Sequence, residues 1–259
     1  MSQPITQSSF TRAQTTTFAP GHAWDRNFFL VMVVLAWVGI IRGFGGDIAN
    51  HLAKNLAPYP LIVHIHAIVF VSWLVLFTVQ ILLIRFKKLP VHRKLGMAMV
   101  WLAAVMVILG PSTALTVQHL NIDKPDADPA FLSVQFTDIL AFAGLVTAGI
   151  LFRQAPSAHK RLILLATLYI TDAGFARWLS GGFIHLLGGG FGAFWVALYF
   201  GPNLLILAVG AYDLITRGRL HTAYVIGIAW VLANQMTALV LYRAPFWLAF
   251  SKRIIALWP

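Results

Sequence analysis

Long apolar runs separated by short polar segments divide this 259-residue chain. An α-helix needs about 20 apolar residues to cross the hydrocarbon core of a bilayer, because it rises 1.5 Å per residue. Seven runs reach roughly that length. They cover residues 27–44, 61–84, 95–117, 131–152, 162–179, 193–215 and 222–242. The pattern predicts an all-α, polytopic membrane bundle of seven transmembrane helices.

The segments at the two ends differ from these runs. Residues 1–24 are rich in Ser, Thr and Gln and have few apolar positions, which predicts a disordered cytoplasmic tail. Residues 244–259 are amphipathic, which predicts a helix lying in the membrane interface. The chain therefore divides into this tail, a seven-helix transmembrane domain over residues 25–243, and an interfacial C-terminal segment.

Glycine and proline mark the expected breaks between and within the spans. Gly43, Gly45 and Gly46 are expected to end the first span. A glycine-rich stretch, 181–192, is expected to connect the fifth span to the sixth. The pair 201–202, Gly-Pro, predicts a kink in the sixth span, since proline removes a helical hydrogen bond.

Charge refines this interpretation. The chain is 59% hydrophobic and 10% charged, and its formal net charge is +11. The basic residues lie mainly at the ends of the spans, where they orient a membrane protein, so we exclude nucleic acid and expect the lipid bilayer as the partner. Lys and Arg concentrate in the short loops on the N-terminal side of the bundle. The positive-inside rule then predicts a cytoplasmic N-terminus and an outer C-terminus.

Three of the predicted hairpins contain a helix that starts at a basic cluster with a histidine. The clusters are 92–96 (His-Arg-Lys-Leu-Gly), 159–162 (His-Lys-Arg-Leu) and 218–221 (Gly-Arg-Leu-His). Such residues typically anchor a helix at the level of the lipid headgroups. Alternatively, they form a cytoplasmic-side ring that binds an anionic headgroup or phosphate. The candidate ring consists of His92, Arg93, His159, Lys160, Arg161 and His221.

Ionisable and amide side chains inside the spans are costly and therefore indicate a functional site. This intramembrane polar set comprises Asp138, Asp172, Arg177, Asn203, Asn234 and Gln235. We expect them to form one polar centre in the outer half of the bundle, or else a purely structural network. Asp172 and Arg177 are five residues apart, about 140° round a helix. Arg177 is therefore expected to pair with Asp138 on another helix.

Histidines supply the candidate cofactor ligands. His64 and His66 are two residues apart, about 200° round a helix, so only one can face the bundle interior, and His66 is the deeper one. Together with His64 or His119 at the outer rim, His66 could hold haem b or a quinone. The chain has no cysteine and no glutamate. Disulfides, thiolate zinc sites and covalent c-type haem are therefore excluded, and no metal site is predicted.

Several of these motifs resemble a family of uncharacterised bacterial seven-helix integral membrane proteins. The shared marks are His66-Ala67 at a helix start, Trp73 and Gln80 along that helix, and the 92–96 helix start. The similarity covers most of residues 25–250. It implies a multi-pass protein of the bacterial cytoplasmic (inner) membrane, and it implies no activity.

The sequence therefore leaves three functions open, and it does not decide whether the protein is an enzyme or an oligomer. The first is a membrane-embedded redox protein that holds haem b or quinone through His66. The second is a carrier of protons or a small solute that uses Asp138, Asp172 and Arg177. The third is a non-catalytic assembly or regulatory subunit of a membrane complex.

Overall fold

The structure, a computed structural model, describes residues 18–19 and 21–258. Within that range it is helical, with nine α-helices and one short 3-10 helix and no strand. The elements are α1 (Asp25–Ala53), α2 (Leu61–Arg85), α3 (Leu89–Asn121), η1 (Pro129–Phe131), α4 (Leu132–Leu151), α5 (Pro156–Tyr169), α6 (Asp172–Leu187), α7 (Phe191–Arg217), α8 (Thr222–Arg243) and α9 (Pro245–Leu257). Most of the tail predicted for residues 1–24 lies outside the described residues.

Six helical segments are long and apolar enough to cross a membrane: α1, α2, α3, η1 with α4, α7 and α8. This confirms the prediction of a helical multi-pass membrane protein. The predicted fifth span, 162–179, is wrong as a single helix. It is divided between α5 and α6, whose axes differ by 47°.

The break has a local cause at Thr171. Its backbone N–H bonds to the Leu168 carbonyl at 3.3 Å, and its hydroxyl donates to the same oxygen at 2.6 Å. A threonine that bonds back to the preceding turn competes with helix continuation. A new helix starts at once, because Gly174 and Phe175 both donate their N–H to the Thr171 carbonyl.

Two predictions about glycine are also wrong. Gly43, Gly45 and Gly46 do not end the first helix, because α1 continues to Ala53. The expected 181–192 connector is largely helical, since α6 runs to Leu187 and only 188–190 connect it to α7. At Gly43 the glycine serves packing instead. A Cβ there would overlap the backbone of Gly174 on α6, so these two helices cross in close contact. The α7 helix is continuous through Pro202.

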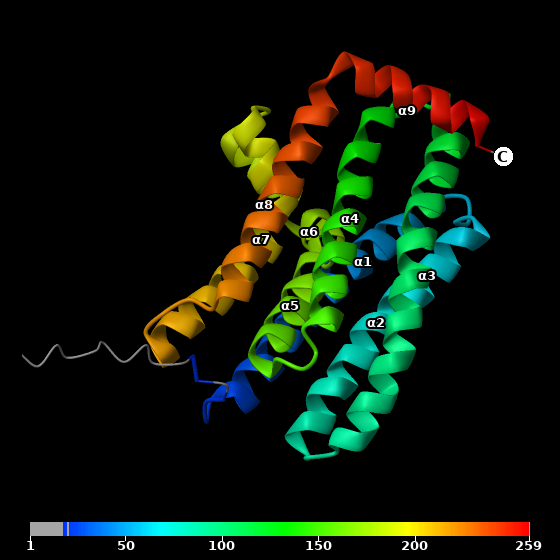
Figure 1. Ribbon diagram of the computed structural model, residues 1–259. Helices are drawn as coiled ribbons and strands as arrows, with labels where there is room; N and C mark the ends of the chain where they lie inside the picture. Colours follow the sequence, from blue (N-terminus) through cyan, green and yellow to red (C-terminus); the bar gives the residue numbers. More distant parts are fainter. Residues whose placement is uncertain (1–17, 20, 259) are drawn as a thin grey trace, which may run out of the picture.

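The helices form an antiparallel bundle with α9 across one end (Figure 1). This end is called the α9 end below, and the opposite end, where α1 begins, is called the Asp25 end. The α9 helix is fixed by polar contacts with the bundle. Trp258 Nε1 donates to the Thr116 hydroxyl at 3.0 Å, and Trp247 Nε1 donates to the Ala130 carbonyl at 3.0 Å.

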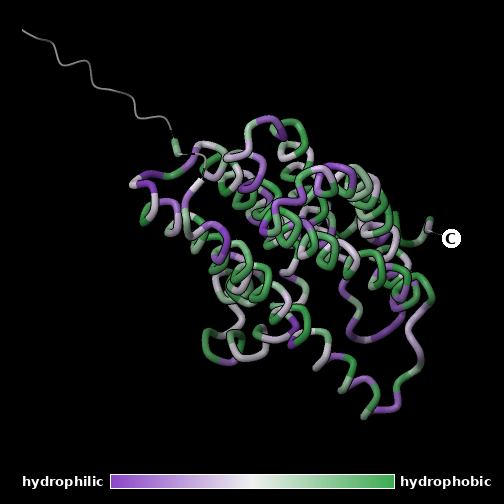
Figure 2. The backbone as a smooth tube through the Cα atoms, turned by 90° about the horizontal axis from the view of Figure 1, so that it is seen from below, coloured by the Kyte–Doolittle hydropathy of each residue, from purple (hydrophilic) through white to green (hydrophobic). Residues whose placement is uncertain are grey.

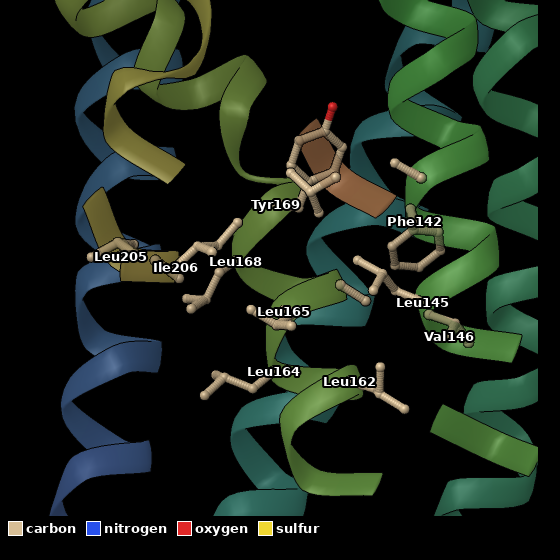
Figure 3. Packing of buried hydrophobic residues seen from close by; sticks show 14 of the residues in the cluster. Phe142, Leu145, Val146, Leu162, Leu164, Leu165, Leu168, Tyr169, Leu205 and Ile206 are labelled. Carbon is tan, nitrogen blue, oxygen red and sulfur yellow. The ribbon is translucent and has the colours of Figure 1, made fainter. Parts of the chain in front are cut away.

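The core lies around α4 and α5. Half of the apolar α4 segment is buried, against 17% of the α3 segment, so α4 is central and α3 is peripheral. Figure 3 shows α4 side chains such as Phe142 facing Leu162 and Leu165 of α5. Large apolar side chains remain exposed along α1, α2 and α3, which is the composition of a lipid-facing surface. Hydrophilic stretches gather at several connections between the helices (Figure 2).

Candidate functional site: a buried carboxyl pair

Asp138 and Asp172 meet inside the bundle. Asp138 lies in the second turn of α4, and Asp172 is the first residue of α6, directly after the break. Each is only 7% exposed. Their carboxyl groups lie close enough to interact directly. Two ionised carboxylates offer only hydrogen-bond acceptors and repel each other, so close contact between them is favoured when one of them carries a proton. This arrangement suits a single proton shared by the two residues.

Two tyrosines complete the surroundings of Asp138. The Tyr169 hydroxyl donates to Asp138 Oδ1 at 2.6 Å, and the Tyr199 hydroxyl approaches the same oxygen at 3.4 Å. Both tyrosines are fully buried, and their rings stack with centroids 6.3 Å apart. Tyr169 is the last residue of α5, so it lies on the other side of the break from Asp172. Sequence reasoning missed both tyrosines because they lie within apolar runs. The only available signal was that a buried tyrosine hydroxyl needs a partner.

Arg177 is not part of this site, and the prediction that it pairs with Asp138 is wrong. Its Nε lies 3.6 Å from Asp47 Oδ2, with both side chains nearly half exposed. Its guanidinium also lies over the Phe44 ring, 4.5 Å from the centroid. The physical reason is the bend at Thr171, which directs α6 toward α1. Among the described residues, Asp138 and Asp172 form no ion pair.

The amide side chains have partners of their own. Gln235 Nε2 donates to Asn203 Oδ1 at 2.8 Å, and Asn203 Nδ2 donates to Gln235 Oε1 at 3.1 Å. This reciprocal pair joins α7 to α8, and Trp195 also donates to Gln235. Asn234 bonds back to the Trp230 carbonyl on its own helix. The Asn203–Gln235 bonds are typical of structural contacts between membrane helices. Of the six residues in the predicted polar set, Asp138 meets Asp172 and Asn203 meets Gln235, but the six do not form one centre.

The three candidate histidine ligands lie in separate surroundings. His66 stacks on Phe70 at 4.0 Å, and its Nδ1 is buried without a hydrogen-bond partner. His64 is exposed and lies edge-on to Tyr59. His119 Nδ1 lies 2.9 Å from the Ile255 carbonyl, so it holds α9 against α3.

A haem does not fit these residues. Both axial ligands of a haem bind one iron atom. The helices α2 and α3 are antiparallel neighbours, and His119 lies about 11 residues farther from their connection than His66, roughly 16 Å along the axis. His64 and His66 point to different sides of α2. Within the described part of the chain, no group of three or more His, Cys, Asp or Glu side chains could hold a metal.

The predicted cytoplasmic-side ring separates into two groups. His92 and His159 lie edge to face, with centroids 6.5 Å apart, and His159 Nδ1 lies 2.8 Å from the Gly149 carbonyl. Lys160 and Arg161 instead face α1 and α7. Lys160 Nζ lies 2.7 Å from Asp25 Oδ2, and Arg161 forms an ion pair with Asp213. Carboxylates therefore neutralise the two cations at the centre of the predicted anion site. Arg93 is exposed.

His221 is the N-cap of α8, and its Nδ1 accepts the Ala223 N–H at 3.0 Å. Burial lowers the pKa of His221 below its ordinary value of 6.5, and the nearby Arg161 guanidinium lowers it further. This histidine is therefore a neutral capping residue and not a cationic anchor.

Comparisons with protein families and known proteins found no match. The chain matches no protein-family model, and no curated protein and no solved structure is similar to it.

Proposed function

We propose that this protein is a proton-linked membrane carrier whose proton-binding site is the Asp138–Asp172 pair. The single observation that carries this proposal is the close approach of two buried carboxyl groups at the break of a membrane helix. In this proposal α5 and α6 form one broken span, the seventh of the bundle. The Asp25 end faces the cytoplasm and the α9 end faces outward, in a bacterial inner membrane.

The energetics of the pair favour a site that changes its protonation. A charge at membrane depth costs several kcal/mol, so proton transfer to and from the pair is coupled to its exposure to water. When two carboxyl groups are in contact, the negative charge on one disfavours ionisation of the other, which favours one shared proton. The Tyr169 hydroxyl, 2.6 Å from Asp138 Oδ1, stabilises the remaining negative charge.

The broken helix supports the same conclusion. Non-helical backbone at membrane depth is tolerated where it lines a cavity or lies within protein, and broken helices form the substrate sites of many carriers. Here the break places Tyr169 and Asp172 on either side of two non-helical residues, 170 and 171. A bend at this point would move Asp172 relative to Asp138 without unfolding either helix.

A purely structural role explains the pair less well. Asp138 already accepts two tyrosine hydroxyl groups, so its hydrogen-bonding capacity does not require a second acid. Placing Asp172 against it adds repulsion and a desolvation cost. An apolar residue of similar volume is often neutral or stabilising at such a position.

The test is proton flux in proteoliposomes that contain a pH-sensitive dye, driven by an imposed pH gradient and a compensating potassium current. We expect wild-type protein to accelerate flux, and Asp138→Asn and Asp172→Asn to abolish most of it. Asp126→Asn, in the polar connection before η1, is the matched control and should conduct like the wild type. Flux through Asp138→Asn at the wild-type rate would contradict the proposal.

A second candidate function is favoured by one observation at His66. Its Nδ1 is buried without a partner, and its ring stacks on Phe70, an arrangement suited to a quinone carbonyl. The test is quenching of tryptophan fluorescence by decylubiquinone, which we expect His66→Phe to weaken. An oxidised and then dithionite-reduced absorption spectrum tests haem in the same sample. Because His66 and His119 lie at different depths, we expect no Soret band, and one that shifts on reduction and is lost in His66→Ala would contradict that geometry and favour a redox protein over a carrier.

A further inference from the structure

One carboxylate joins three helices at the Asp25 end. Asp25 is the first residue of α1. Its Oδ2 lies 2.7 Å from Lys160 Nζ of α5. Its Oδ1 accepts the Tyr212 hydroxyl of α7 at 2.6 Å and Arg217 Nη2, also of α7, at 2.9 Å. Asp25 therefore bridges α1, α5 and α7 through charged hydrogen bonds.

Helix packing at this junction is sparse apart from one aromatic stack, Phe28 of α1 on Tyr212 of α7. The α1 helix makes extensive contact with α6 but little with α5 and very little with α7. Its contact with α6 lies nearer the α9 end, where Gly43 meets Gly174. The start of α1 is thus fixed to α5 and α7 by the polar contacts of Asp25 together with the stacking of Phe28 on Tyr212, whose centroids are 3.8 Å apart. Arg85 also ties it to α2 by donating to the Arg26 carbonyl and to Asn27 Oδ1. Regions with few packed contacts are those that open with the smallest free-energy change.

The segment before α1 covers the same junction. The Phe18 ring lies over the Arg161 guanidinium at 4.6 Å and over that of Arg217 at 5.4 Å. It also meets His221 edge-on at 4.6 Å. Arg217 Nε donates to the Ala19 carbonyl at 3.3 Å. These contacts close the space between α5, α7 and α8 at this end.

The other end of α1 differs. A cavity of about 530 Å³ lies between α1 and α6, and its lining includes Arg42, Asp47, Asn50 and Arg177. The Asp25 end is therefore closed by ion pairs, whereas the far part of α1 and α6 borders a solvent-open groove. A carrier in one of its two access states has this asymmetry.

From these contacts we propose that Asp25 closes a cytoplasmic gate, formed with Lys160, Tyr212 and Arg217. Loss of the Asp25 contacts lets the start of α1 move away from α5 and α7, which exposes the bundle interior at the Asp25 end. The movement is a tilt of α1 about its close contact with α6 at Gly43, so opening this end shifts the other end of α1 against α6 and narrows the cavity there. The inference rests on the proposed carrier function.

The absence of cysteine makes the gate directly testable, because a single introduced cysteine is labelled without background. The inner reporter is Leu164→Cys, at a fully buried position one turn beyond Lys160 on α5. Figure 3 shows Leu164 pointing away from α4. The outer reporter is Asn50→Cys in the α1–α6 cavity. The measured quantity is the rate of maleimide labelling of each reporter in detergent.

We expect Asp25→Asn to raise the Leu164→Cys rate on the order of tenfold or more and to lower the Asn50→Cys rate. Tyr212→Phe, which removes only one hydroxyl, should cause a smaller change of the same kind. Asp126→Asn is the control and should change neither rate. An unchanged Leu164→Cys rate would overturn the gate, and a rise at both reporters would overturn it as well, since that indicates local unfolding.

Labelling does not depend on flux, so the two proposals can fail separately. Reciprocal labelling changes without proton flux would retain the gate and contradict the proton-linked carrier. Proton flux that depends on Asp138, without any effect of Asp25→Asn on labelling, would retain the proton-linked carrier and contradict the gate.

Discussion

Arg161 on α5 and Asp213 on α7 form a two-point ion pair that is almost fully buried, with side chains 2% and 1% exposed. Arg161 Nε donates to Asp213 Oδ2 at 2.7 Å, and Nη2 donates to Oδ1. The remaining Nη1 donates to the Ser157 carbonyl at 2.8 Å. The pair thus joins α5 to α7 next to the Asp25 contacts and orients the helix that ends at Tyr169.

The first prediction concerns this pair. Asp213→Leu leaves the Arg161 cation buried without its partner, so we expect the free energy of unfolding to fall by roughly 3–5 kcal/mol. Reversible unfolding in mixed micelles measures the change. Asp47→Leu is the matched control: its pair with Arg177 is nearly half exposed, so its loss should change little. The double variant Arg161→Met with Asp213→Leu should recover most of the stability. Equal effects of Asp213→Leu and Asp47→Leu would contradict this account.

The second prediction compares two glycines of α1. A Cβ at Gly43 would overlap the Gly174 backbone, whereas a Cβ at Gly46 has no atom within 4 Å. Gly43→Ala should therefore lower the free energy of unfolding by about 1–3 kcal/mol. Gly46→Ala should leave it unchanged or raise it by up to about 1 kcal/mol, because alanine favours the helix. The same unfolding assay tests both, and shifts of the same sign and size would refute close α1–α6 packing.

A third prediction ranks the two tyrosines at Asp138. A hydrogen bond to a charged group contributes about 1.5–3 kcal/mol. Tyr169 lies 2.6 Å from the carboxylate oxygen and Tyr199 lies 3.4 Å from it. Tyr169→Phe should therefore lower the free energy of unfolding more than Tyr199→Phe does. The reverse order would mean that Tyr199, and not Tyr169, is the principal donor to Asp138.

The fourth prediction is a pH dependence from His221. Because its pKa lies below the ordinary 6.5 in the folded protein, the unfolded chain binds a proton first as the pH falls. Stability should therefore decrease as the pH falls below about 6.5 and level off below the folded-state pKa. His221→Asn keeps an N-cap side chain but does not titrate, so its thermal unfolding should lose this part of the pH dependence. An unaltered pH profile in His221→Asn would exclude His221 as the source.

Hydropathy predicted much of the fold because each span had to be apolar along its whole length. The limits of α4 and α8 agree with the predicted spans within about two residues. The break at Thr171 could not be predicted in this way, since 162–179 is apolar on both sides of it. Gly43 was misread for a related reason: glycine ends helices and also permits close helix contact, and only the position of Gly174 decides between them.

The candidate site shows a similar division. Asp138 and Asp172 could be predicted because a carboxyl group in an apolar run is conspicuous. Their contact could not, because it depends on how α4 lies against the α5–α6 break. Arg177 was assigned to the wrong acid because the position of a residue along a span does not tell which side of the helix its side chain faces. Asp25 attracted no attention because it lies where the polar tail meets the first span.

The shared proton is the central claim, and infrared spectroscopy of the purified protein in a bilayer tests it most directly. At neutral pH we expect a protonated-carboxyl C=O band that shifts in D₂O. The band should be altered in Asp138→Asn and Asp172→Asn and absent in the double variant, while Asp126→Asn leaves it unchanged. A wild-type spectrum with only ionised carboxylates, or a band that persists in the double variant, would contradict the account.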